Sequence, residues 1–316
     1  MIGLESVYIL TGLMFGAYAL QHLFDRSNPR RWRSASFWGA YAVTFIAGSY
    51  LPDVVNGILV LAMVILAGFG GLKPGATRTS TPEQRLDGSR RFGNLLFVPA
   101  LVIPAVTVIG TLALKGVIVA GRPLVDPAQV TLISLALGVL AALAVAFALL
   151  RPPVGTPLRE GRRLIDAVSW AAALPQMLAA LGAVFVLSGV GKVVASLVTS
   201  TVPMTSGTAA VVAYAVGMAL FTIVMGNAFA AFPVMTAGVG LPLIVHQFGG
   251  NPVTMSALGM LSGFCGTLMT PMAANFNIVP VALLELPDRW AVIKVQALTG
   301  VLILAFNIVL MTYVVF

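Results

Sequence analysis

The chain has 316 residues, of which 59% are hydrophobic and 9% are charged, and its formal net charge is +8. Soluble domains carry about 25% charged residues, so the 18 basic and 10 acidic side chains here cannot cover a soluble fold. The composition excludes a soluble enzyme and a disordered chain. Apolar blocks long enough to cross a bilayer predict an all-α polytopic membrane protein.

Residues 1–166 contain five apolar runs, which predict a five-span N-terminal scaffold. The runs cover residues 4–24, 37–50, 54–72, 95–114 and 128–150. Thirteen of the 18 Lys and Arg residues lie in three polar stretches, 25–36, 73–91 and 151–166. Cytoplasmic loops of membrane proteins are enriched in Lys and Arg. We therefore expect these three stretches in the cytoplasm, the N-terminus outside, and no nucleic-acid partner.

Residues 167–316 follow a different pattern, which predicts a transport-type region with re-entrant hairpins and discontinuous helices. An apolar span over 167–187 precedes an amphipathic stretch, 188–200, which we expect either to lie along the membrane interface or to continue the span. The next apolar segments are short and are separated by small and helix-breaking residues: 208–225, 233–248, 253–269 and 278–286. A full span begins at Ala291. In total we expect about 8–10 membrane segments.

Two motifs in this region place Asn beside small residues and near proline. At this depth in the membrane an uninterrupted helix would have the lowest free energy. They are Gly226-Asn227-Ala228-Phe229-Ala230-Ala231-Phe232-Pro233 and Gly266-Thr267-Leu268-Met269-Thr270-Pro271-Met272-Ala273-Ala274-Asn275-Phe276-Asn277. Proline frees a carbonyl, glycine lets the chain leave helical geometry, and in lipid such breaks persist only where protein, water or a ligand satisfies the backbone. The N-terminal ends of half-helices suit a carboxylate, whereas freed carbonyls with Asn or Thr side chains suit Na⁺.

The motifs supply the candidate substrate- or ion-binding residues. These are Gly226, Asn227, Ala228, Phe229, Thr267, Thr270, Pro271, Ala274, Asn275 and Asn277. A coupling Na⁺ would lie near Asn227, Thr270 and Asn275. The alternative is that the breaks only pack, because Asn and Thr also join membrane helices while Gly and Ala allow close approach.

Acidic side chains are absent between Asp166 and Glu285. A carboxylate relay inside that part of the chain is therefore excluded, and an anionic substrate is favoured over a cationic one. His22 and His246 are far apart in sequence and form no metal-ligand spacing with Cys265, the one cysteine. Because nucleophile and P-loop motifs are also absent, we expect no enzyme activity and no cofactor beyond a coupling ion.

The two motifs resemble those of the ion-transporter superfamily, which contains many bacterial carboxylate carriers. The similarity covers residues 167–316 and is carried by Gly226-Asn227-Ala228-Phe229 and Thr270-Pro271-Met272-Ala273-Ala274-Asn275. More closely, the whole length resembles a bacterial inner-membrane family, the DUF979 type, found as one of two subunits of a 5-oxoproline (pyroglutamate) transporter. The resemblance implies that a hairpin tip and a broken helix from each of two inverted repeats enclose the substrate. This chain departs from that pattern because it shows one such cassette.

One cassette is half a site, so we expect a second membrane subunit to carry the complementary half. The chain is then a membrane subunit of a secondary active transporter for a small carboxylate in the bacterial inner membrane. It would be coupled to Na⁺ or H⁺ and work by alternating access. The resemblance implies 5-oxoproline as substrate. A non-transporting structural or assembly subunit of a membrane complex is the alternative.

Overall fold

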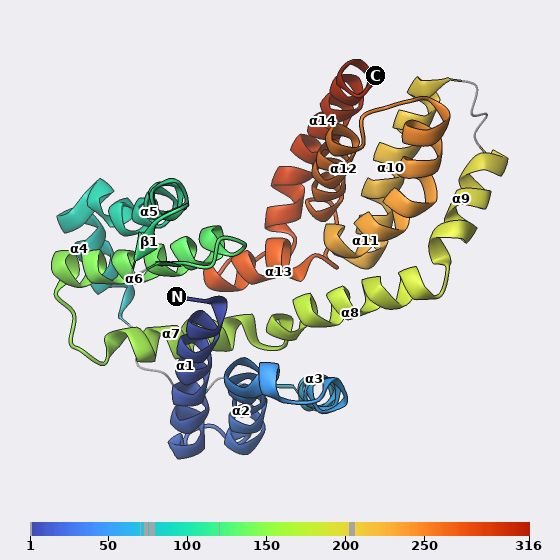
Figure 1. Cartoon of the computed structure of the whole chain (residues 1–316). Coiled ribbons are helices and arrows are strands. Elements are labelled where there is room, and N and C mark those ends of the chain that lie inside the picture. The colour runs from blue at the N-terminus through green and yellow to red at the C-terminus, as the bar shows by residue number, and fades with distance from the viewer. Residues whose placement is uncertain (1, 70, 73–74, 76–79, 120, 202–205) are drawn as a thin grey trace. The chain divides into compact units, whose positions relative to one another are not determined.

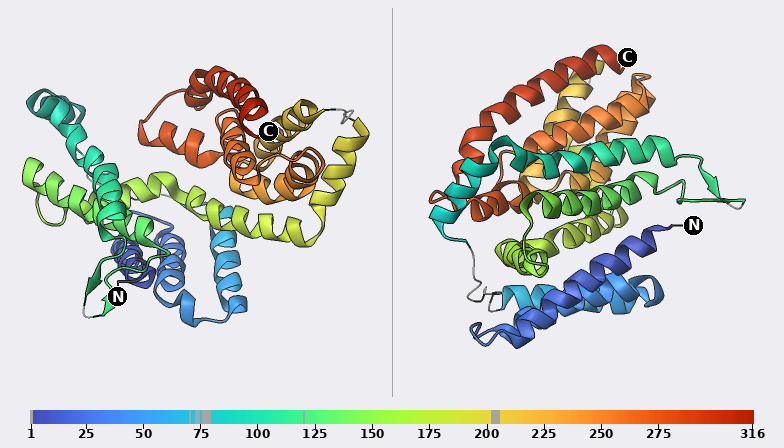
Figure 2. Two further views of the ribbon diagram at one scale, coloured as in Figure 1. Left: turned by 45° about the horizontal axis from the view of Figure 1, so that its top comes forward. Right: turned by 90° about the vertical axis from the view of Figure 1, so that its left-hand side faces the viewer.

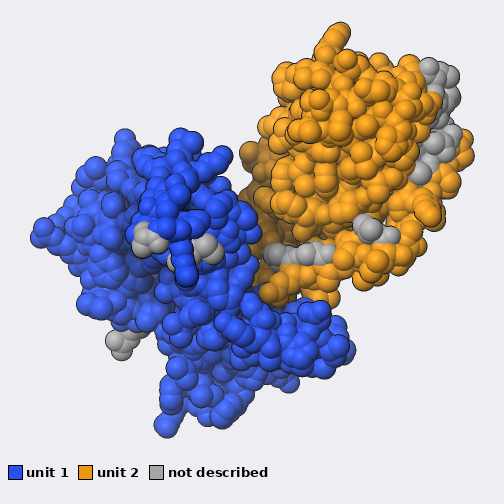
Figure 3. Space-filling view, in the orientation of Figure 1, with its two compact units in different colours: residues 1–166 blue, residues 167–316 orange. Residues whose placement is uncertain are grey.

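The computed structural model describes residues 2–69, 71–72, 75, 80–119, 121–201 and 206–316, and these residues fold into helices joined by short connections (Figure 1). The chain divides into two compact units, residues 1–166 and 167–316, which are coloured separately in Figure 3. The division falls near the end of a helix, α7. The functional labels of a scaffold and a transport-type region stay predictions.

The first unit contains helices and one short β-hairpin, and its last helix, α7, runs two residues past the division. The elements are α1 (Leu4–Phe24), α2 (Arg31–Ala47), η1 (Gly48–Tyr50), α3 (Asp53–Gly68), α4 (Pro82–Phe92), η2 (Gly93–Phe97), α5 (Val98–Leu114), β1 (Ile118–Val119), β2 (Arg122–Pro123), α6 (Val130–Leu150) and α7 (Thr156–Val168). The two strands pair antiparallel, with Ile118 opposite Pro123.

The second unit is helical throughout its described residues. The elements are η3 (Ser169–Ala173), α8 (Leu174–Leu187), α9 (Val190–Thr201), α10 (Gly207–Met225), α11 (Ala228–Met235), η4 (Thr236–Gln247), α12 (Pro252–Thr267), α13 (Ala274–Leu283) and α14 (Ala291–Val314). Of these, η4 is a π-helix, a wider form that is rare over more than one turn.

Six helical segments within the described chain are long and apolar enough to cross a membrane. They are Leu4–Phe24, Glu83–Leu114, Val130–Leu150, Gly207–Met225, Ala228–Gln247 and Ala291–Val314. Two shorter apolar helices, Asp53–Gly68 and Ala274–Leu283, accompany them, and a bent pair of helices around residue 170 passes the same test when taken together. The prediction of an all-α polytopic membrane protein is confirmed, whereas its orientation and the identity of the membrane stay predictions.

Helices α1 and α2 pack through aromatic rings, and Figures 1 and 2 show the two lying side by side. Phe15 stacks on Trp38 with ring centroids 5.6 Å apart and an interplanar angle of 5°. Phe37 and Trp38 are almost fully buried. Helices α5 and α6 form a second close pair, in which a side chain at Gly138 would lie 2.8 Å from the carbonyl oxygen of Ile103.

Several predicted boundaries in this unit are wrong, because stretches read as polar loops are helical. Helix α2 begins at Arg31 rather than at residue 37, and α7 occupies most of the predicted loop 151–166. Within the predicted loop 73–91, α4 begins with a capping box: Thr81 Oγ1 accepts from the Gln84 N–H at 3.2 Å, and Gln84 Oε1 accepts from the Thr81 N–H at 3.1 Å. The reciprocal cap starts a polar helix that an apolar periodicity does not reveal.

The core of the second unit lies among α10, α12, η4 and α14 (Figure 1). Small residues on α12 let it approach α10 closely: a side chain at Gly259 would lie 2.3 Å from the Tyr214 hydroxyl, and one at Gly266 would lie 2.4 Å from the Ala219 carbonyl oxygen. This is the small-residue packing typical of membrane helices. The buried Tyr214 hydroxyl bonds the Thr236 hydroxyl at 2.9 Å and so ties α10 to η4.

Segments predicted as simple apolar runs also differ from the structure. The predicted run 233–248 is covered by a helix that begins earlier, at Ala228, and continues as a π-helix from Thr236. The predicted run 278–286 corresponds to a helix that begins at Ala274. Helix α9 is separate from α8, because Gly189 takes a positive φ of +70° between them, so the alternative of one continuous span is wrong. Its place along a membrane interface stays a prediction.

Candidate functional site

The first motif forms a sharp break between α10 and α11. Gly226 ends α10 with φ +75°, a conformation that side chains rarely adopt. Asn227 then caps α11, because its Oδ1 accepts the Phe229 N–H at 2.7 Å. A side chain at Gly226 would lie 2.4 Å from the Met272 carbonyl oxygen. Since Met272 belongs to the second motif, the two breaks are in direct contact.

The second motif forms the break between α12 and α13, and two buried polar side chains hold its shape. Thr270 Oγ1 donates to the Ile223 carbonyl at 2.8 Å and accepts from the Met272 N–H at 3.2 Å. Asn277 Nδ2 donates to the carbonyls of Thr267 and Thr270, at 2.7 and 2.6 Å. Thr270 is 2% exposed and Asn277 is 1% exposed. Their buried polar atoms therefore satisfy backbone groups that the broken helix leaves without partners.

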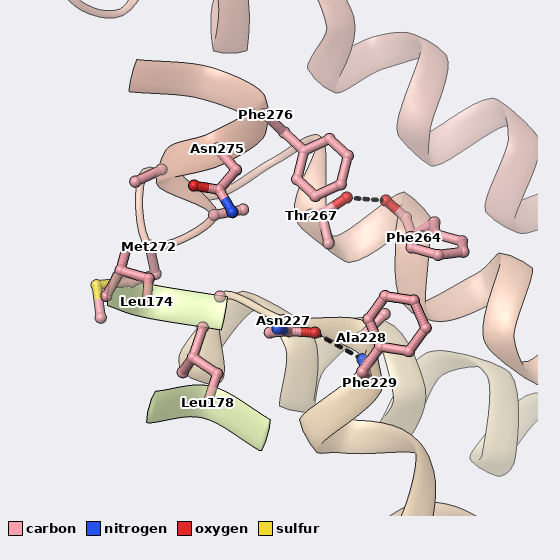
Figure 4. Close-up of a pocket in the computed structure, with 13 residues that line it drawn as sticks. Leu174, Leu178, Asn227, Ala228, Phe229, Phe264, Thr267, Met272, Asn275 and Phe276 are labelled. Atoms are coloured by element: carbon pink, nitrogen blue, oxygen red, sulfur yellow. Dashed lines mark hydrogen bonds between the residues drawn. The ribbon is translucent and has the colours of Figure 1, made fainter. Parts of the chain in front are cut away.

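A pocket of about 150 Å³ lies where the two breaks meet (Figure 4). Of the predicted site residues, the structure gathers around it Gly226, Asn227, Ala228, Phe229, Thr267, Ala274 and Asn275. Thr270, Pro271 and Asn277 do not line it. Of the three residues predicted to lie near a coupling Na⁺, Asn227 and Asn275 line the pocket and Thr270 does not, and the Na⁺ site stays a prediction.

Further lining residues were not predicted: Leu174, Leu178, Phe264, Met272, Ala273 and Phe276. Met272, Ala273 and Phe276 lie within the second motif, and Phe264 lies two residues before it, so all four could have been found from that motif. Leu174 and Leu178 come from α8, and no feature of the sequence links that helix to the breaks. Only the folded chain brings them to the pocket.

Two helix N-termini meet at the pocket, that of α11 at Asn227 and that of α13 at Ala273. Helix N-termini carry a partial positive charge and N–H groups that bind anions. No side chain caps α13, and the N–H groups of Ala274 and Asn275 meet no hydrogen-bond partner among the described residues. The described residues that line the pocket carry no charged side chain. The field there is set by the two helix ends and favours a negative group.

The side chains of Asn227 and Asn275 add amide donors from the two facing breaks (Figure 4). Because Asn227 Oδ1 is bonded to the Phe229 N–H, its Nδ2 is the end left to donate. Asn275 is exposed, and no described residue bonds its side chain. The pocket therefore offers two amide groups and two backbone N–H groups, a donor set that matches a carboxylate.

A second, more apolar cavity of about 280 Å³ lies on the far side of a shared wall made by Phe264, Thr267 and Phe276. Asn307 and Cys265, which contact each other at 3.8 Å, line that cavity. Among the described residues no group of three or more His, Cys, Asp or Glu side chains is arranged to hold a metal ion.

The fold and the pocket define a polytopic helical membrane protein with a pocket between two helix breaks, lined among the described residues by uncharged side chains. The chain belongs to the family described as DUF979, protein of unknown function, whose family model matches residues 5–316. Searches of curated proteins and of solved structures found no match to the chain.

Proposed function

We propose that this protein is a membrane subunit of a secondary active transporter for a small carboxylate, with 5-oxoproline as the first substrate to test. The observation that carries the proposal is the meeting of two helix N-termini at one pocket whose described lining residues are uncharged. Broken helices that aim their N-terminal ends at an anionic substrate group are a recurring solution in secondary transporters.

In this proposal the carboxylate accepts hydrogen bonds from Asn227 Nδ2, from the Asn275 amide and from the first N–H groups of α13. Hydrogen bonds to a charged group contribute about 1.5–3 kcal/mol each. The apolar body of the substrate would pack against the aromatic rings of Phe229 and Phe264. A free ammonium group would find no carboxylate partner there, so a substrate without one is favoured over a zwitterionic amino acid.

The size of the pocket supports a second subunit. Complete small-molecule sites enclose about 300–1,000 Å³, whereas this pocket measures about 150 Å³. A partner subunit with its own pair of broken helices would supply the missing wall, and alternating access would follow from movement of the pocket-bearing part against its surroundings. The coupling ion in this proposal is Na⁺ or H⁺.

The test is uptake by proteoliposomes that contain this chain with its partner subunit, with a Na⁺ gradient and a proton gradient imposed separately. We expect Asn275→Ala to lower uptake at least about tenfold, because an amide donor to a charged group contributes about 1.5–3 kcal/mol. Asn227→Ala should do the same. Full uptake by both variants would contradict the assignment of the pocket.

A matched control separates binding from helix capping. Asn251 caps α12 with hydrogen bonds to the Val253 and Thr254 N–H groups, at 2.9 and 3.2 Å, and does not line the pocket. Asn251→Ala removes a cap of the same kind as Asn227→Ala, with a loss of about 1 kcal/mol. We expect it to retain uptake, so that equal losses in the two variants would point to helix stability instead of substrate contact.

A non-transporting structural subunit is the second candidate, and the buried bonds of Thr270 and Asn277 favour it, because they show that the protein alone satisfies much of the second break. In that case every pocket substitution would leave uptake intact while deletion of the chain abolishes it. Uptake that depends on Asn275 would exclude this candidate.

A further inference from the structure

A polar contact joins the last helix of the second unit, α14, to the second break. Gln296 is half-buried in the second turn of α14, and its Nε2 donates to Oδ1 of Asn277 on the neighbouring helix α13 (Figure 1). Asn277 is also the residue whose amide bonds the carbonyls of the break. Gln296 lies in neither sequence motif and does not line the pocket, yet one side chain connects it to both.

The backbone of the break determines the direction of every hydrogen bond in this contact. The carbonyls of Thr267 and Thr270 can only accept, so Asn277 must present Nδ2 to both of them, at 2.7 and 2.6 Å. Both hydrogens of Nδ2 are then used, and Oδ1 is the atom left to face Gln296. Because Oδ1 can only accept, Gln296 must present its NH₂ group. Two backbone carbonyls thus fix the orientation of both amides.

Asn277 fastens the beginning of α13 to the end of α12. Thr267 is the last residue of α12, where the terminal carbonyls have no partner within the helix, and Thr270 lies in the connection to α13. Asn277 is the fourth residue of α13. Ala274 and Asn275, which line the pocket, belong to the same first turn. The bonds of Asn277 therefore set where the first N–H groups of α13 lie relative to the pocket.

Loss of the donor on α14 would loosen this attachment. Asn277 is 1% exposed, so water does not reach its Oδ1, and a buried acceptor without a donor carries a free-energy penalty. Asn277 can reduce the penalty only by moving its amide, and that movement costs the bonds to the two carbonyls. Helix α14 provides a firm base for the donor, because a side chain at Gly300, about one turn further on, would lie 3.1 Å from the Cys265 carbonyl oxygen of α12.

We propose that Gln296 is a positioning residue for the pocket. By donating to Asn277 Oδ1 it holds the Asn277 amide against the two carbonyls, and it thereby fixes the N-terminus of α13 that presents donors to the carboxylate. The effect on uptake rests on the proposed function, whereas the effect on α13 does not and can be measured without transport.

The first measurement is amide hydrogen exchange of the full chain in nanodiscs, followed by mass spectrometry of peptides that cover α13. Gln296→Met removes the donor and keeps a side chain of similar length. We expect the N–H groups of the first turn of α13 to exchange at least about tenfold faster than in the wild type. Gln247→Met, the same change at an exposed position at the end of η4, should leave that rate unchanged. Wild-type exchange in Gln296→Met would overturn the proposal.

Two charged substitutions keep the test decisive if Gln296→Met fails to fold. Gln296→Lys supplies a donor, whereas Gln296→Glu supplies only acceptors when it is ionised, and both place a charge at the same half-buried position. We expect exchange in α13 to stay within about threefold of the wild type in Gln296→Lys and to rise at least about tenfold in Gln296→Glu. Equal rates in these two variants would show that donation to Asn277 is unimportant.

Uptake of 5-oxoproline by proteoliposomes that contain this chain with its partner subunit gives the second measurement. We expect Gln296→Met to raise KM at least about tenfold while the maximal rate changes by less than about twofold, because substrate donors are displaced but none is removed. Gln296→Lys should restore KM. A wild-type KM in Gln296→Met, in an assay that responds to Asn275→Ala, would contradict the positioning role. If the exchange results hold but the wild type takes up no carboxylate, the proposed function fails and the role of Gln296 in placing α13 stands.

Discussion

At the scale of single residues, the contact between the two breaks rests on Gly226. Its positive φ requires glycine, and its Cα hydrogen faces the Met272 carbonyl, where a side chain would overlap. These two demands are separable, because Gly249 also takes a positive φ, +73°, but has open space where its side chain would lie. Substitutions at Gly226 and Gly249 therefore distinguish the effect of backbone strain from the effect of losing the Gly226–Met272 contact, which shapes the pocket.

We predict that Gly226→Ala destabilises the protein by more than about 2 kcal/mol and abolishes uptake. Gly249→Ala should cost about 1 kcal/mol, because it introduces the strain without the overlap. Thermal unfolding in detergent, followed by circular dichroism, measures the difference. Equal losses of stability in the two variants would show that the Gly226–Met272 approach is unimportant.

At the scale of elements, the second break separates residues that shape the pocket from residues that face it. Asn277 and Asn275 lie two positions apart on α13, yet the first is buried with its amide bonded to two carbonyls and the second is exposed. The sequence motif placed both in one candidate site. The structure gives the two side chains different neighbours, so substitutions at the two positions should differ in their effect on stability.

We predict that Asn277→Ala lowers stability by about 2–6 kcal/mol, because two buried carbonyls each lose a donor at about 1–3 kcal/mol. Asn275→Ala should change stability by less than about 0.5 kcal/mol, since its side chain is exposed. Unfolding in urea or by heat measures both, and the uptake assay then shows whether activity follows stability. A strongly destabilised Asn275→Ala protein would argue for a structural role at both positions.

The apolar runs predicted the class of fold and most of the long helices, because crossing a bilayer demands a length and composition that sequence displays directly. The two motifs also predicted both breaks, since glycine, proline and a capping Asn act locally. Helix α4 could have been found from Thr81, Pro82 and Gln84, whose pattern is a helix start. The π-helix was not predicted: Pro242 and the glycines of this segment indicate an irregular helix but not its type, and the bond between Thr236 and Tyr214 joins residues distant in sequence.

The motifs of the candidate site could be predicted from the sequence, because they are local. The contacts within the site could not, because they join segments that are distant along the chain. Spacing along the chain showed that Asn227 and Asn275 both lie beside helix breaks, but not that the breaks touch through Gly226 and Met272. Nor could spacing show that Thr270 and Asn277 turn inward to satisfy carbonyls. Side-chain direction at an irregular turn depends on contacts from distant segments, such as Ile223 for Thr270.

At the scale of the whole molecule, the distribution of positive charge leads to a prediction of orientation. The basic stretches include the polar helices α4 and α7, and Lys and Arg beside membrane spans favour the cytoplasmic side. With the buried Cys265 replaced by Ser, single cysteines can be placed one at a time at exposed positions.

We predict that Ser89→Cys and Gly155→Cys react with a membrane-impermeant maleimide only after the cytoplasmic face is opened. Ala128→Cys, which lies in the weakly charged connection before α6, should react in intact spheroplasts. The opposite pattern would reverse the predicted topology, and labelling of all three from one side would contradict the count of crossings between them.

The uncharged lining of the pocket has a consequence for how pH can act on this protein. None of the described side chains that line it ionises between acidic and neutral pH, so these side chains keep the same charge under all those conditions. Acidification can then alter substrate capture only by protonating the substrate itself or a group elsewhere in the protein. A comparison of one substrate with a weakly acidic and one with a strongly acidic carboxyl group would separate these two origins.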